Sequence, residues 1–79
     1  MTIEFVQGNK RYSVSLSVWF GEVLKICYSG GAYSSERITC KASLKKALLS
    51  RDRFNIEQEL GGSIPDLDES AKKILEWLG

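Results

Sequence analysis

Apolar and polar residues alternate most clearly in the segment from Arg11 to Val18. Tyr12, Val14, Leu16 and Val18 alternate there with Arg11, Ser13, Ser15 and Ser17. A period of two over eight residues predicts a half-buried β-strand. Strand signals bounded by turn residues also cover residues 3–6, 22–28 and 36–41. In the last of these segments we expect Ile38 and Cys40 to face one side, and Arg37, Thr39 and Lys41 the other.

The hydrophobic period changes after Lys41, where helical spacing begins. A helix capped by Ser43 is predicted to reach about Ser50, and a short turn capped by Asn55 is predicted to end at Gly61-Gly62. The last helix is predicted over residues 67–78, because Asp66 and Glu69 form a capping-box pattern directly after Pro65. Its apolar stripe consists of Leu67, Ala71, Ile74, Leu75 and Leu78.

The order of four strands followed by helices predicts an α+β fold, a four-stranded antiparallel sheet followed by C-terminal helices (β-β-β-β-α). With 79 residues the chain has room for one core. We therefore expect a single domain over residues 1–79, with the sheet in 1–41 and the helical part in 42–79. A domain this small gains little stability from one core, so we also expect a homodimer.

Composition narrows the functional classes. There is no apolar run of 18 residues and no signal-peptide pattern at the N-terminus, so a soluble intracellular protein without a membrane span is expected. The chain has no histidine, and Cys27 and Cys40 are too far apart for a Cys-x-x-Cys site. We therefore predict no metal, no cofactor and no enzymatic activity.

The charge is distributed unevenly along the chain. Residues 1–53 hold nine Lys or Arg and four Asp or Glu, a net charge of +5, whereas residues 54–79 hold two and six, a net charge of −4. A basic front half of this kind can mark a surface that binds polyanions.

One face of the predicted sheet combines cations, hydroxyls and aromatic rings. If neighbouring strands are antiparallel, Lys25, Arg37, Thr39 and Lys41 share the outward surface of Arg11, Ser13, Ser15 and Ser17, with Trp19 at its end. Cations neutralise phosphates, hydroxyls donate to backbone oxygens, and rings stack on unpaired bases. The pattern indicates a single-stranded nucleic-acid-binding surface, although an ordinary solvated sheet face has the same alternation.

The roles of four large aromatic residues are open at this point. Trp19 and Phe20 can either project into solvent or close the core, and Tyr33 can either stack on a base or anchor its loop. Trp77 lies beside the apolar stripe of the last helix, where it can fold back onto the sheet or meet a partner subunit. We favour the partner, and predict dimerisation through Leu67, Ala71, Ile74, Leu75, Trp77 and Leu78.

Several short motifs occur in a suggestive order. They are Lys10-Arg11-Tyr12-Ser13-Val14-Ser15, Gly21-Glu22-Val23-Leu24, Ile38-Thr39, Ala47-Leu48, and Ile64-Pro65-Asp66-Leu67-Asp68-Glu69 followed by Ala71-Lys72-Lys73. Together they resemble the single-stranded-DNA-binding domain of the transcriptional positive cofactor four family, and more distantly the purine-rich-element-binding repeat. The chain departs from that family by extra residues over 51–62, and by Lys45 in place of an early helical tryptophan. The resemblance implies a homodimer that binds single-stranded DNA, with Lys10 and Arg11 at the site.

Two functions follow as expectations. The first is binding of single-stranded DNA or RNA with low sequence specificity, in transcription or DNA maintenance, by Lys10, Arg11, Ser13, Ser15, Trp19, Lys25, Arg37 and Lys41. With four to six phosphates neutralised, log K would fall with log salt at about −0.7 per contact. The alternative is a small protein-protein interaction module or inhibitor that uses the sheet face or the C-terminal helix.

Overall fold

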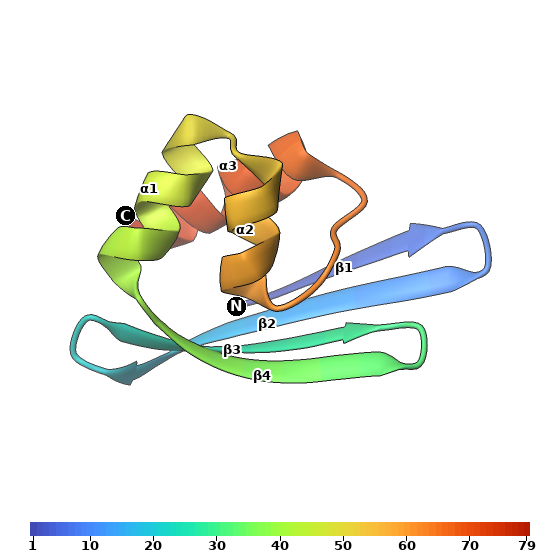
Figure 1. Cartoon of the computed structure of the whole chain (residues 1–79), viewed down its shortest axis with the longest axis horizontal. Helices are drawn as coiled ribbons and strands as arrows, with labels where there is room; N and C mark the ends of the chain where they lie inside the picture. Colours follow the sequence, from blue (N-terminus) through green and yellow to red (C-terminus); the bar gives the residue numbers. More distant parts are fainter.

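The computed structural model describes all 79 residues and contains four strands and three helices (Figure 1). The strands are β1 (Thr2–Gln7), β2 (Lys10–Phe20), β3 (Val23–Gly30) and β4 (Tyr33–Cys40), and the helices are α1 (Lys41–Ser50), α2 (Arg53–Leu60) and α3 (Leu67–Leu78). The predicted α+β class, the element order and the bounds of the last helix are confirmed. The second strand is three residues longer than predicted, and the fourth starts at Tyr33 rather than Glu36.

The four strands form one antiparallel sheet in the order β1-β2-β3-β4. Each connection is a tight hairpin, and Gly8, Gly21 and Gly31 occupy these turns with positive φ angles of 62°, 56° and 62°. Glycine is the residue that adopts this conformation at little steric cost, which explains why the turns fall at these positions.

All three helices cover the same face of the sheet (Figure 1). We call this the helix side and the opposite surface the outer face. Alternate sheet residues meet the helices in one hydrophobic core, whose members are Ile3, Phe5, Val14, Leu16, Leu24, Ile26, Tyr28, Leu44, Ala47, Leu48, Ile56, Leu60, Ile64, Ala71, Ile74 and Leu78. The outer face has no covering layer, so its side chains are available to a ligand or partner.

The helix caps agree only partly with the prediction. Asp66 caps α3 as expected, its Oδ1 accepting a hydrogen bond of 2.9 Å from the Glu69 N–H. The first helix is instead capped by Cys40, whose Sγ accepts from the Ser43 N–H at 3.4 Å, and the second is capped by Asp52 rather than Asn55. Both helices therefore begin before the residues predicted to cap them. No helix in the structure is both long enough and apolar enough to cross a bilayer.

Polar contacts hold α2 and the loop after it against the end of the sheet. The Tyr28 hydroxyl donates to the Ser63 carbonyl at 2.5 Å, and the Ser35 hydroxyl donates to the Gly61 carbonyl at 2.8 Å. The Thr39 hydroxyl donates to the Glu59 carboxylate. Because each contact joins residues far apart in sequence, together they fix where the helical layer ends over the sheet.

Candidate nucleic-acid interface

The serine row of β2 lies on the outer face, as predicted. Val14 and Leu16 are buried on the helix side, so Arg11, Ser13, Ser15 and Ser17 point the opposite way. The β2–β3 register places Lys25 directly across from Ser17, on the same face. Arg11 and Lys25 thus share one surface, but six residues of strand separate their positions, which is about 20 Å.

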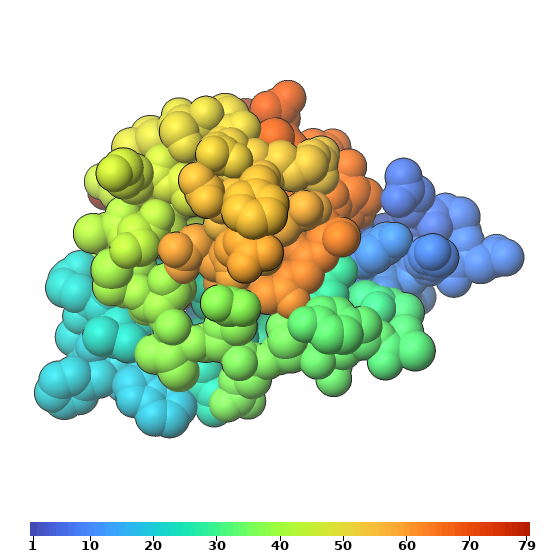
Figure 2. All heavy atoms as spheres, in the orientation of Figure 1, coloured from blue at the N-terminus to red at the C-terminus, as the bar shows by residue number.

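Two aromatic rings stand at one end of this surface. Val18 pairs with Leu24 and Phe20 pairs with Val23, so Trp19 is the extra residue of a β-bulge. Val23 belongs to the outer-face set of β3, which places its partner Phe20 there too. The side chains of Trp19 and Phe20 are 58% and 78% exposed. Figure 2 shows this β2–β3 hairpin end standing out from the helical layer.

Lys25 contacts both Trp19, at the aromatic end of the outer face, and Glu36, on the neighbouring strand β4. Its Nζ lies 4.9 Å from the ring centroid of Trp19, within cation–π range. The same ammonium forms an ion pair of 3.2 Å with Oε1 of Glu36 on β4. A phosphate on the Trp19 side of Lys25 would therefore compete with Glu36 for the ammonium.

The predicted orientation of β4 is wrong. Arg37 pairs with Ile26 and Thr39 pairs with Leu24, and because both partners are core residues, Arg37 and Thr39 lie on the helix side. Ile38 lies across from Lys25 on the outer face and is 52% exposed. This strand meets α2 through polar groups, so its single isoleucine does not mark the buried side.

Two further predicted site cations also lie away from the outer face. Lys10 precedes Arg11 and so lies on the helix side, where it lines a cleft with Tyr12. Lys41 is the first residue of α1, its N–H donates to the Glu22 carbonyl at 2.8 Å, and it borders a hollow with Trp77 on the helix side. The structure brings together five of the eight predicted residues: Arg11, Ser13, Ser15, Trp19 and Lys25. Lys10, Arg37 and Lys41 are not part of this surface.

The outer face is not basic, which corrects the sequence-based expectation. Glu4 pairs with Ser13 and Glu36 pairs with Cys27, so both carboxylates lie on the same surface as Arg11 and Lys25. Arg11 and Lys25 together carry two positive charges, and Glu4 and Glu36 carry two negative charges. The net formal charge of these four groups is therefore zero. The excess positive charge of the first 53 residues instead lies on the helix side and on the helices.

The predicted dimerisation stripe is mostly part of the chain's own core. Ala71, Ile74 and Leu78 are buried in the monomer, and Leu67, Leu75 and Trp77 pack against that core. The prediction that this stripe meets a second subunit is therefore wrong for the three buried residues, which have no surface left to offer. Trp77 lies beside Val18 and Leu24, so it folds back onto the sheet.

Sequence reasoning missed three residues of the outer face. Phe20 reaches it only because of the bulge, and Ile38 and Glu36 reach it through the register of β4. A bulge has no specific sequence pattern. The one local signal is the pair of aromatic residues before Gly21, which interrupts the alternation of apolar and polar residues. Tyr33, left open as a stacking residue, lies on the helix side across from Gly30.

Two titratable groups differ from their usual acidity. Burial raises the pKa of the Tyr28 hydroxyl, and the neighbouring Tyr12, Glu57 and Tyr33 raise it further when they are charged. Hydrogen bonds from Ser43 lower the pKa of the exposed Cys40 thiol, which lies 2.9 Å from the Ser43 hydroxyl oxygen. Tyr28 therefore stays neutral to higher pH, and Cys40 forms a thiolate more readily than an ordinary cysteine.

The structure gathers no group of three or more His, Cys, Asp or Glu side chains able to hold a metal ion. Comparison of the chain with protein-family models, curated proteins and solved structures gives no match.

Proposed function

We propose that the outer face binds single-stranded nucleic acid with little sequence preference. The observation that carries the proposal is the position of Trp19 and Phe20, two exposed rings beside Lys25 on an uncovered sheet. The serine row continues from them along β2 to Arg11. The family resemblance found in the sequence points to the same class of ligand.

The outer face has the length of a short binding track. Nine residue steps from Arg11 to Phe20 span about 30 Å of strand. Single-strand-binding folds cover about 4–16 nucleotides, so this track suits the lower end of that range. The bound nucleic-acid chain would run along β2, with its bases against Trp19 and Phe20 and its phosphates near Lys25, Ser15 and Arg11.

Stacking contributes more than charge in this arrangement. Each base stacked on an aromatic side chain contributes about 1–3 kcal/mol, and two rings are available. Only Arg11 and Lys25 can neutralise phosphates on this face, so log K should fall with log salt at about −1.4 rather than the steeper slope expected from four to six cations. Glu4 and Glu36 oppose the capture of a polyanion, so we expect weak binding.

Fluorescence anisotropy of a labelled 12-mer of mixed sequence, measured at several salt concentrations, tests the proposal. Binding to single strands but not to duplex is expected, and Arg11→Gln and Lys25→Gln should each reduce the salt slope by about 0.7. Lys72→Gln is the matched control, because Lys72 is an exposed lysine on α3 without an ion pair. Absence of binding at low salt, or equal effects of all three variants, would reject the proposal.

A second candidate is a contact with a second copy of this chain through the same surface. Trp19, Phe20, Val23 and Ile38 occupy neighbouring positions at one end of a face whose charges balance. Apolar clusters with few net charges are typical of the centre of a protein interface. Light scattering over a concentration series would show a dimer that Ile38→Lys abolishes, whereas a monomer at every concentration would exclude this candidate.

A further inference from the structure

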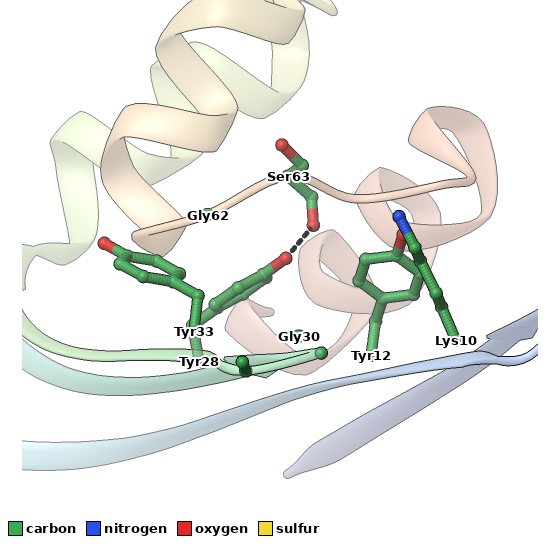
Figure 3. Close-up of a pocket in the computed structure, with 9 residues that line it drawn as sticks. Lys10, Tyr12, Tyr28, Gly30, Tyr33, Gly62 and Ser63 are labelled. Atoms are coloured by element: carbon green, nitrogen blue, oxygen red, sulfur yellow. Dashed lines mark hydrogen bonds between the residues drawn. The ribbon is translucent and has the colours of Figure 1, made fainter.

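A concave site lies on the helix side, beyond the end of the helical layer. It is a cleft of about 620 Å³ that lies between the loop after α2 and the end of the sheet that carries the β1–β2 and β3–β4 hairpins. Figure 3 shows Tyr12 and Lys10 rising from β2 on one side, Tyr28 in the middle and Tyr33 on the other side, with Gly62 and Ser63 above them. We call this the tyrosine cleft. Its volume is in the range of small-molecule pockets.

Two glycines allow the tyrosines to gather there. A Cβ at Gly30 would lie 2.5 Å from the Tyr28 hydroxyl oxygen and 2.9 Å from Cδ1 of Tyr12. A Cβ at Gly62 would lie 2.5 Å from Cδ1 of Tyr28 and closer still to two other ring carbons. Neither glycine has a positive φ angle, so each is required by the ring beside it rather than by a turn.

The middle ring is fixed, the Tyr12 ring is half-buried against the core, and the Tyr33 ring is exposed. Tyr28 is 4% exposed and its hydroxyl donates to the Ser63 carbonyl, as the dashed line in Figure 3 marks. Its ring lies 5.9 Å from that of Tyr33 at an interplanar angle of 53°. Tyr33 is 58% exposed, so its outer surface can stack on a planar group.

The charge of the cleft selects an anion. Lys10 is the only ionised residue that lines it, and Lys10 forms no ion pair. A neighbouring hollow shares Tyr33, Gly62 and Ser63 and is also lined by Arg37, which forms no ion pair, and by Glu57. Glu57 is held by Arg53 at 3.3 Å and by the Ile64 N–H at 2.9 Å. Of the cations that lie away from the outer face, Lys10 thus borders this cleft and Arg37 borders the neighbouring hollow.

We propose that the tyrosine cleft binds a small aromatic anion, a planar ring that carries a phosphate or carboxylate group and has about the size of a nucleoside monophosphate. The ring stacks on Tyr33 or Tyr12, and the anionic group contacts the Lys10 ammonium. Charge-assisted contacts of this kind are stronger than neutral hydrogen bonds. This site is independent of the outer face, because no residue of the proposed nucleic-acid track lines it.

Nitrogen-15 NMR titration with AMP and with indole-3-carboxylate tests the proposal and distinguishes phosphate from carboxylate ligands. Saturable shifts at the amides of Gly31, Ala32, Gly62 and Ser63 with either compound are the expected result. Adenosine, which lacks the anion, and inorganic phosphate, which lacks the ring, should each bind more weakly than AMP.

Variants then assign the contacts. Lys10→Gln should weaken binding about 1.5- to 5-fold, the range of an exposed ion pair, and Tyr33→Ala about 5- to 100-fold, the range of a lost stacking contact. Lys72→Gln should leave binding unchanged. The proposal is overturned if neither probe produces saturable shifts at the cleft, if the two cleft variants bind like wild type, or if the shifts centre on Trp19 and Phe20.

Discussion

Gly62 makes the packing of the loop after α2 directly testable, because the substitution Gly62→Ala places one methyl group against a buried ring. The new Cβ would lie 2.5 Å from Cδ1 of Tyr28, well inside the optimal carbon–carbon separation of about 3.5–4.0 Å. The backbone at Gly62 is not in the left-handed region, so alanine is tolerated locally. The cost therefore arises from displacing Tyr28.

Displacing Tyr28 has two consequences whose magnitudes are known. Overpacking a well-filled site costs about 1–3 kcal/mol. Moving the ring also weakens its hydrogen bond to the Ser63 carbonyl, which contributes about 0.5–1.5 kcal/mol. Replacing glycine by alanine returns about 0.4–1 kcal/mol through the unfolded chain. The net loss is about 2 kcal/mol, which lowers Tm by about 8–16 °C in a domain of this size.

Urea and thermal denaturation followed by circular dichroism measure this loss. Ser63→Ala is the neighbouring control and should change stability by less than about 0.5 kcal/mol, because the side chain of Ser63 is exposed and only its carbonyl is used. In a Tyr28→Val background Gly62→Ala should become nearly neutral, since Cδ1 and the ring atoms beyond it are gone. The same loss in both backgrounds, or none in either, would refute the assigned contact.

Three further predictions concern single groups. The raised pKa of Tyr28 adds stability that is complete below the ordinary tyrosine pKa of about 10 and is lost as the pH rises above that value. Above pH 10 the unfolding free energy of Tyr28→Phe should therefore fall less steeply with pH than that of the wild type. Asp66→Ala removes the cap of α3 and should cost about 0.5–2 kcal/mol in urea denaturation, whereas an unchanged midpoint would contradict the capping role. Cys40 should react with iodoacetamide faster than Cys27 near pH 7.5, and Ser43→Ala should narrow that difference; equal rates in wild type would contradict the lowered pKa.

The strongly periodic parts of the fold were predictable from the sequence. The alternation from Arg11 to Val18 fixes which side of β2 is buried, because every second residue is apolar over eight positions. The last helix was equally clear, since Asp66, Glu69 and a continuous apolar stripe agree on its start and its buried face. Local pattern and tertiary packing point the same way at these positions.

The candidate site was less predictable, because it depends on register and packing rather than on local pattern. In β4 the helix side is occupied by Ser35, Arg37 and Thr39, whose polar groups or aliphatic stems meet α2 and its following loop. The lone Ile38 lies on the outer face. The bulge at Trp19 likewise depends on pairing with β3 and turns Phe20 toward the outer face. A one-residue change of register exchanges the two faces of a strand, and the sequence of β4 does not specify it.

Trp19 emission offers the most direct test of the proposed outer-face interface. The variant Trp77→Phe leaves Trp19 as the sole tryptophan, so its fluorescence reports on the aromatic end of the outer face alone. Titration with a single-stranded 12-mer at low salt should quench that emission saturably, and Phe20→Ala should weaken the binding about 5- to 100-fold. Trp19 emission that stays unchanged while the oligonucleotide binds, or an absence of binding altogether, would contradict the account.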